Sequence, residues 1–140
     1  MKVELSRFRI KPDKIARCDE WLKLLQERHA ECVATLDREK MYVEVIFRER
    51  YQGEDYLNWF TIQDETGEAL ETSPFEIDHI HRAFGGECID TSFGAVEPAP
   101  QMILIAPFIS AAMGWTTPQH AAEAWTGGQT WRSIKPKDVS

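Results

Sequence analysis

The stretch YVEVIFRERYQGEDYLNWFTIQ, residues 42–63, decides the fold. Successive side chains of Tyr42–Tyr51 sort onto two faces, which is the period of a β-strand. Gln52-Gly53-Glu54-Asp55 is a short turn, and Tyr56–Gln63 is a further strand. Two strands joined by so short a turn form an antiparallel hairpin. The sequence therefore predicts a β-hairpin in the middle of the chain.

The segment before the hairpin predicts a strand followed by a long helix. Val3–Ile10 alternates as a strand does, and Asp13 is a candidate helix cap after Pro12. From Asp13 to about Asp37 the apolar side chains recur at roughly 100° per residue, which is helical. This inner stripe consists of Cys18, Leu22, Leu25, His29, Cys32, Val33 and Leu36.

A second helix is predicted after the hairpin. Ser73 is the expected N-cap, Pro74 takes the first helical position and Glu76 completes a capping box. The helix is expected to run to about Phe84. The pair Gly85-Gly86 then weakens or breaks it, because each glycine costs about 1 kcal/mol relative to alanine inside a helix. The helix could resume through Cys88-Ile89.

The apolar run Met102–Ala106, closed by Pro107, is the predicted fourth strand. The element order is then βαββαβ, an α+β ferredoxin-like pattern with a four-stranded antiparallel sheet and both helices on one face. On the other face we expect an exposed apolar patch, which is typical of an interface. The patch would contain Tyr42, Ile46, Tyr56, Phe60 and Ile62. We therefore expect a homodimer in which two sheets pack face to face.

Residues 1–113 are expected to form this domain and residues 114–140 a C-terminal extension. The last part of the chain holds three of the five tryptophans and a Gly-Gly pair, and Thr117 could begin a short helix through Trp125. We expect this tail to be docked in part and frayed at its end.

Composition excludes several classes of protein. The 140 residues suit one globular domain with a real core. Net charge is −7 without a lysine or arginine cluster, which argues against nucleic acid or anionic lipid as a partner. We find neither a signal peptide nor an apolar run that would span a membrane. Cys18, Cys32 and Cys88 are expected to be reduced thiols, so we expect a cytoplasmic protein.

Three blocks carry a family resemblance: VELSRFRIKP (3–12), ERHAECVATLDREKMYVEVIFRE (27–49) and ECID (87–90). Through them residues 1–113 resemble an uncharacterised bacterial family, a domain of unknown function, within the dimeric α/β barrel superfamily. The resemblance implies the fold and dimerisation. It implies no activity, because the superfamily contains cyclases, sugar mutarotases, monooxygenases and proteins without a known role.

Two histidines in FEIDHIHRAF, residues 75–84, suggest a metal site or a proton-transfer site. On a helix, His81 shares the buried stripe of Ile77, whereas His79 lies on the solvent face. The two rings therefore cannot chelate one ion. Glu76-x-x-His79 is only half of a di-iron carboxylate motif. His29-x-x-Cys32, with Cys88 as a third ligand, is incomplete as a zinc site, so we predict no metal and no cofactor.

His29 and His81 lie on the inner stripes of two helices that pack on the same sheet face. We expect both to line one pocket between helices and sheet, together with Phe47 and Trp59, where they could act as general acid and base. The alternative is that each is a core histidine, hydrogen-bonded to a carbonyl or a carboxylate, as buried polar groups usually are.

Glu44 and Arg48 are expected on the helix-free face, with Arg7, Arg9 and Asn58. They could form a polar ligand site at the centre of the dimer, in which arginine binds a carboxylate or a phosphate. The alternative that we prefer is an ion-paired dimer interface. Two functions therefore stay open: a small-molecule pocket with cofactor-free proton-transfer chemistry, or a non-catalytic dimeric binding or scaffold protein.

Overall fold

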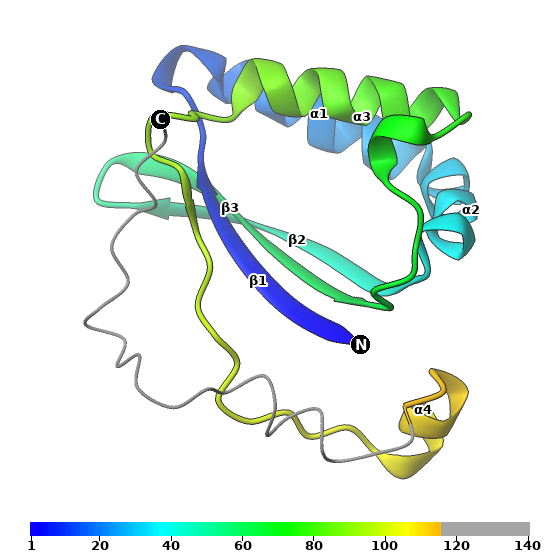
Figure 1. Ribbon diagram of the computed structural model, residues 1–140. Helices are drawn as coiled ribbons and strands as arrows, with labels where there is room; N and C mark the ends of the chain where they lie inside the picture. The colour runs from blue at the N-terminus through cyan, green and yellow to red at the C-terminus, as the bar shows by residue number, and fades with distance from the viewer. Residues whose placement is uncertain (116–140) are drawn as a thin grey trace.

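A four-stranded antiparallel sheet, with the helices between residues 15 and 88 over one face and the helix of residues 107–112 on the other side, forms the body of the computed structural model, which describes residues 1–115 (Figure 1). Its strands are β1 (Lys2–Arg9), β2 (Met41–Tyr51), β3 (Glu54–Gln63) and β4 (Ala95–Val96), in the order β2-β3-β1-β4. This is the predicted α+β architecture, and it is compatible with a ferredoxin-like fold. The helix expected over 117–125 and the docking of the extension lie outside the described residues.

The β2–β3 hairpin confirms the prediction made from residues 42–63. Tyr51 pairs with Glu54 across a two-residue turn, in which Gln52 and Gly53 have φ angles of 49° and 79°. Two successive positive φ angles define a type I′ turn, whose twist matches that of the strands it joins. Because pairing continues up to this turn, β3 begins at Glu54 rather than at Tyr56.

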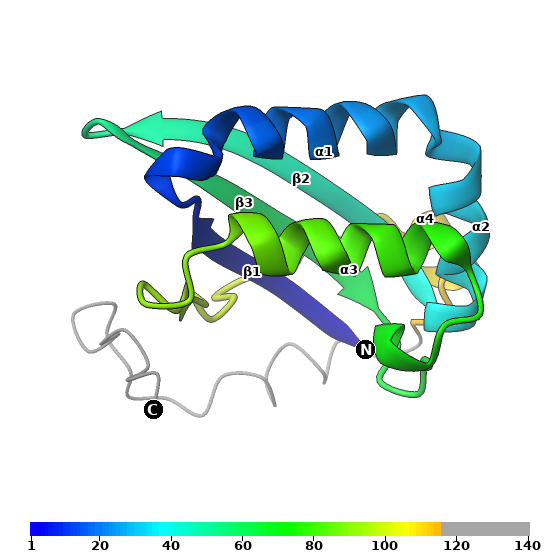
Figure 2. The same cartoon turned by 90° about the horizontal axis from the view of Figure 1, so that it is seen from above.

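Helices α1 (Ile15–Glu27) and α3 (Glu76–Cys88) lie side by side over the sheet, and α2 (His29–Glu39) turns away at one end (Figure 2). Short 3-10 turns, Pro12–Lys14 and Leu70–Thr72, lie before α1 and α3, and α4 (Pro107–Ala112) is the last described helix.

The single helix predicted from Asp13 to Asp37 is wrong, because the helix is interrupted at Arg28. The φ and ψ angles of Arg28 are −102° and 28°, outside helical geometry. Its guanidinium donates to Glu31 at 2.8 Å and to Glu76 at 3.0 Å, so it links α2 to the start of α3. Asp13 lies in the 3-10 turn, and the residue that precedes α1 is Lys14, whose side chain makes no capping bond.

Helix α3 begins later than predicted and passes Phe84 without the expected interruption. Phe75 is at the N-cap, and Ser73 acts before it: its Oγ accepts the Phe75 N–H at 3.1 Å and donates to the Asp78 carboxylate. The helix continues through Gly85-Gly86 to Cys88. Because residues on both sides of the glycine pair are buried in the core, packing outweighs the helix propensity of glycine.

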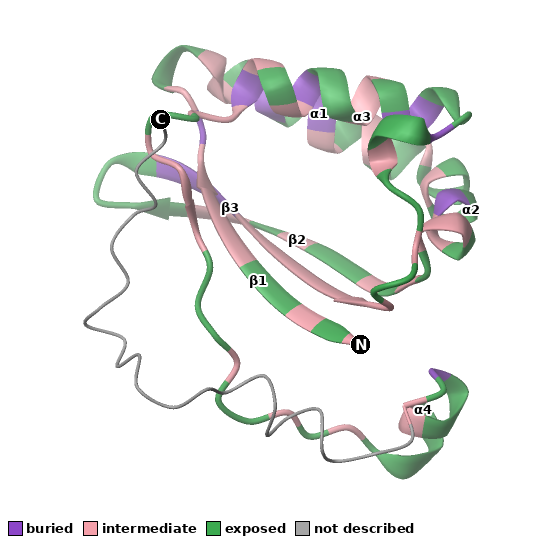
Figure 3. Cartoon of the chain, viewed as in Figure 1, coloured by how far each residue is buried: buried purple, intermediate pink, exposed green. Residues whose placement is uncertain are grey.

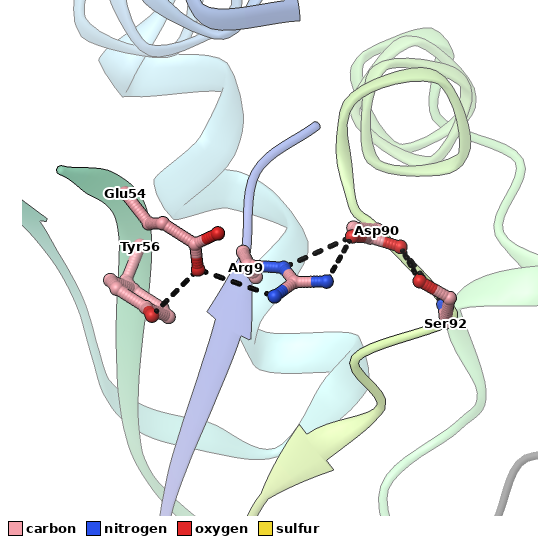
Figure 4. Close-up of polar contacts among 5 residues, drawn as sticks. All are labelled: Arg9, Glu54, Tyr56, Asp90 and Ser92. Carbon is pink, nitrogen blue, oxygen red and sulfur yellow. Dashed lines mark hydrogen bonds and ion pairs between the residues drawn. The ribbon is translucent and has the colours of Figure 1, made fainter. Parts of the chain in front are cut away.

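The Arg9 side chain fixes where the chain returns to the sheet after α3 (Figure 4). Its Nε and Nη2 donate to the Asp90 carboxylate at 3.0 and 2.8 Å, and its Nη1 donates to Glu54 at 3.2 Å. The Asp90 N–H also donates to the Arg9 carbonyl. Hydrogen bonds from Ser92 and Arg9 lower the pKa of Asp90 to about 2, so the link is ionised at neutral pH.

This link explains why the predicted fourth strand is wrong. The chain is held beside β1 directly after α3, so Ala95–Val96 pairs with Arg7 and Phe8 and occupies that part of the sheet edge. Met102–Ala106 lies outside the sheet, with Met102 and Leu104 76% and 86% exposed. An apolar composition indicates that a segment can form a strand, but it does not show whether a sheet edge is free to pair with that segment.

Buried residues lie along α1 and α3 and at one end of β3 (Figure 3). The hydrophobic core cluster consists of Ile10, Cys18, Trp21, Leu57, Phe84 and Cys88. Trp21 stacks on Phe84, with the ring centroids 6.3 Å apart and the planes 3° from parallel. The contact joins α1 to α3 over the centre of β3.

The faces of β2 are the reverse of the prediction. Ile46 packs against the core, so it is not on the helix-free face. Alternation then places Val45 and Phe47 on that face, where both are exposed. Tyr42 lies at a register shift between Met41 and Val43. On β3, core residue Leu57 leaves Tyr56, Phe60 and Ile62 on the helix-free side, as expected. The expected exposure is wrong for Tyr56, which is buried there.

None of the helices in the described part of the chain is long and apolar enough to cross a membrane.

Replacing Leu57 with alanine is expected to destabilise the fold by about 2–5 kcal/mol, because the side chain is fully buried and a cavity would remain. Urea denaturation followed by circular dichroism measures the change. Leu104→Ala removes the same atoms from an exposed site and is the matched control, expected to stay within about 0.5 kcal/mol of the parent. Equal effects of the two substitutions would contradict the assignment of the core.

Candidate functional site

A cavity of about 710 Å³ lies between the helices and the inner face of the sheet. Residues of β1, β2 and β3 line one side, and residues of α1, α2 and α3 line the other. Its apolar walls include Phe8, Leu22, Leu25, Ile46, Trp59 and Ile77. A concave space of this size, with apolar walls and a few polar groups, is the usual form of a small-molecule site.

Trp59 of β3 connects two polar groups of this cavity. Its Nε1–H donates to Glu44 Oε1 at 2.8 Å. Glu44 is on the neighbouring strand, where it pairs with Thr61, so the two side chains are diagonal neighbours on one sheet face. The His81 ring meets Trp59 edge-on, with ring centroids 5.2 Å apart and planes at 75°. The indole therefore lies between a carboxylate and an imidazole.

His81 is half-buried on α3, and its protonation is set by a second tryptophan. The Nε1–H of Trp21 donates to His81 Nδ1 at 3.1 Å. Because an indole N–H can only donate, Nδ1 is the acceptor, and the neutral ring carries its proton on Nε2. Burial lowers the pKa of His81 against a smaller opposing effect of Asp78. The ring is therefore a neutral imidazole at pH 7, with Nε2–H as its remaining donor.

Burial raises the pKa of Glu44, the Trp59 hydrogen bond partly offsets this, and the nearby Asp78 raises it further. Water reaches the Glu44 side chain through the cavity, but protein atoms surround it on most sides, which explains how an accessible carboxyl is poorly solvated. The pKa of Glu39, at the end of α2, is raised as well, by burial and by the neighbouring carboxylates of Asp78 and Glu44. The Asp78 carboxylate therefore acts on both glutamates of the cavity wall.

Arg48 lies on the same face of β2 as Glu44, toward the helices. Both residues line the cavity, so their predicted position on the helix-free face is wrong. Arg48 Nη2 contacts Asp55 at 3.0 Å, and Nη1 contacts Asp19 at 3.3 Å. Nη1 also donates to Cys18 Sγ at 3.2 Å. Strand alternation was predicted correctly, but it does not show which face the helices cover.

The predicted site residues separate into two groups. His29 and His81 both line the cavity, with Trp59, Glu44 and Arg48. His29 is the first residue of α2 and is exposed, so it lies at the rim and not on a buried stripe. Phe47 does not line the cavity, because it is on the opposite face of β2 and is 54% exposed.

Polar residues on the helix-free face pair with one another inside the chain. Arg7 contacts Glu49 at 3.3 Å, and its guanidinium carbon lies 3.8 Å from the centre of the Tyr56 ring. Asn58 Nδ2 donates to the same Glu49 oxygen, Oε2, at 2.7 Å. The arginine charge there is already compensated, which leaves little for an anionic ligand.

The cysteines and His79 offer no nucleophile or metal centre in the described residues. Burial raises the pKa of the Cys18 thiol to about 11, and burial also raises the pKa values of Cys32 and Cys88. A reactive cysteine needs the opposite shift. His79 is exposed on the outer side of α3. No group of three His, Cys, Asp or Glu residues within 1–115 is placed to hold a metal ion.

Sequence reasoning missed Trp21, Glu39 and Asp78. Trp21 was recognisable, because it follows Cys18 by three residues and precedes Leu25 by four, which is helical spacing. Asp78 lies between two apolar positions of α3 and is buried because Ser73 donates to it. Glu39 reaches the cavity only through the bend between α1 and α2, for which the sequence contains no glycine or proline signal.

Stability should respond to pH through His81. Folding lowers the pKa of His81, so the unfolded chain binds a proton at this position more readily than the folded chain does. The contribution of His81 to the free energy of unfolding is therefore fully present above the unfolded pKa of about 6.5 and is lost as the pH falls below that value. The melting temperature should therefore drop less for His81→Gln than for the parent between about pH 7.5 and about pH 5.5. Glutamine keeps an acceptor for Trp21. His79→Gln, on the exposed side of the same helix, should lose as much melting temperature as the parent over this pH range. Equal dependence of the melting temperature on pH in all three proteins would refute the lowered pKa of His81.

Comparison with known proteins gives one match. The model of a family of unknown function, DUF6176, matches residues 1–111, and the chain belongs to that family. No curated protein matches the chain. No solved structure matches it either.

Proposed function

We propose that this member of a family of unknown function binds a small molecule in the cavity between its helices and its sheet. The observation that supports the proposal is the cavity of about 710 Å³ itself, in which apolar walls surround a few polar groups. Trp59, Glu44 and His81 are the groups that we expect a ligand to contact. The proposed setting is the cytoplasm, where the free thiols of Cys18, Cys32 and Cys88 stay reduced.

Proton-transfer chemistry without a cofactor is the activity that these groups suit. Neutral His81 offers Nε2–H to a developing negative charge, since Nδ1 is occupied by Trp21. Glu44, with its raised pKa, is the better general base of the two. His29 at the rim is a further candidate for ligand contact. This assignment replaces the predicted histidine pair by a carboxyl and an imidazole on either side of Trp59.

A cavity-blocking variant tests the binding function. Ligand-observed NMR on mixtures of small metabolites should find binders for the parent chain, and Thr61→Phe should remove them by filling the space beside Glu44. We expect at least a roughly tenfold loss of affinity. Ala34→Phe puts the same ring on an exposed position of α2 outside the cavity and should keep binding. Ligands that bind the Thr61→Phe variant as tightly as the parent, or the absence of any binding to the parent, would refute the proposal.

A non-catalytic dimer is the second candidate function, and the helix-free face favours it. Leu5, Val45, Phe47 and Tyr51 are all exposed there, beside the paired charges of Arg7 and Glu49. An apolar surface with compensated charges is typical of an interface between copies. In this proposal two chains pack through their sheets, in the manner of a dimeric α/β barrel. That arrangement and a bacterial source remain predictions.

Light scattering at micromolar concentration tests the dimer. The parent should have twice the mass of one chain. Phe47→Glu should give the single-chain mass, because a charge would be buried without a partner at the interface. Val33→Glu, which adds the same charge at an exposed site on α2, should leave the dimer intact. A single-chain mass for the parent would exclude this candidate.

A further inference from the structure

The charges on the cavity wall are one-sided. Glu4, Glu39, Glu44 and Asp78 all line the cavity, and Arg48 is the lining residue with a positive charge in the described part of the chain. The two histidines among the lining residues are His29 at the rim and His81, which is held neutral by burial. The polar part of the cavity is therefore acidic.

Arg48 does not neutralise these carboxylates, because its guanidinium is ion-paired with other acidic residues. Arg48 contacts Asp55 at 3.0 Å and Asp19 at 3.3 Å, so two carboxylates outside the cavity already compete for it. Asp55 is among the few buried charged residues of the core. Removing Arg48 from it would leave that buried carboxylate with the longer contact to Arg50 alone, at 3.4 Å, which is costly.

Glu39 and Glu44 form no ion pair within residues 1–115, unlike Glu4, which has Lys2 at 3.5 Å. Glu44 accepts a hydrogen bond from the neutral Trp59 N–H, which leaves its second oxygen free for a ligand. Burial raises the pKa values of Glu39 and Glu44, and the nearby Asp78 carboxylate raises both further. A positive charge placed among them would relieve this repulsion.

The geometry distinguishes an organic cation from a metal ion. No three acidic or histidine side chains among the described residues converge closely enough to coordinate a metal. The cavity of about 710 Å³ is also far larger than a single ion needs. Trp59 beside Glu44, with Phe8 packed edge-on against it at 6.2 Å, supplies aromatic surface. Aromatic rings attract ammonium groups and apolar substituents alike.

On the basis of the proposed binding function, we infer that the cavity selects small organic amines, with the ammonium group at Glu44 and Glu39 and the apolar part against Trp59 and Phe8. Anionic ligands are disfavoured by the same carboxylates. Neutral ligands of equal shape lose the charged hydrogen bond to Glu44. The preference follows from the wall of this chain and needs no partner residue.

Three probes of one shape and different charge test the inference: phenethylamine, phenethyl alcohol and hydrocinnamate. Isothermal titration with the full chain at neutral pH should give an affinity for the amine about tenfold higher than for the alcohol, and no binding of the carboxylate. Glu44→Gln should reduce the affinity for the amine to that for the alcohol. Glu49→Gln, the same change on the opposite face of β2, should preserve the preference.

The outcomes separate the two levels of the proposal. Alcohol or carboxylate binding as tight as that of the amine would overturn the preference for amines and leave ligand binding in the cavity standing. An amine preference that survives Glu44→Gln would also overturn the inference, because the selecting charge would lie elsewhere. Binding of none of the probes, together with no hits for the parent in the metabolite mixtures, would overturn the proposed function itself.

Discussion

Trp21 is almost fully buried, and its ring connects the hydrophobic core to the cavity. It stacks on Phe84 of α3, lies 6.0 Å from the ring of Trp59, and donates its N–H to His81. A buried indole N–H without an acceptor would cost about 1–3 kcal/mol, so packing α1 on α3 also requires an acceptor at position 81. The position and the tautomer of the imidazole therefore follow from the core, before any ligand binds.

The bend at Arg28 explains why one end of the helical layer is closed and the other is open. Toward the start of α1, Cys18 meets Cys88 and Ile10 in the buried core. Beyond Arg28 the chain changes direction, and residues of α2 such as Cys32 and Leu36 line the cavity instead of joining the core. The ion pair of Arg28 with Glu76 ties α2 to α3 across this opening. A continuous helix would have followed a different path along the sheet.

The sequence was informative where the pattern is local and ambiguous where it depends on distant partners. The hairpin could be predicted because the turn Gln52-Gly53 and both strands are contiguous. Strand alternation could be predicted too, but both faces of β2 carry apolar side chains, so Glu44 and Arg48 were assigned to the wrong one. Met102–Ala106 has the composition of a strand, yet the edge of β1 was already taken through a contact between Arg9 and Asp90, which are far apart in sequence.

For the candidate site, the same distinction holds. The inward direction of His81 followed from helical spacing, and the structure places its ring on the cavity wall. Its role as a donor through Nε2 depends on Trp21, sixty positions away in the sequence, and no local pattern indicates it.

The acidic residues of the cavity wall lower the stability of the fold, and this loss of stability favours a role for them in binding. Desolvation and repulsion by the nearby Asp78 carboxylate raise the pKa values of Glu39 and Glu44, which means that the folded state holds these carboxylates less favourably than water does. Apolar side chains at both positions would extend the walls formed by Leu25 and Ile46. Proteins commonly sacrifice stability where a site must bind or react. An unpaired carboxylate next to an aromatic ring in a cavity lowers stability in this way. A ligand with a positive charge would offset the loss by pairing with the carboxylate.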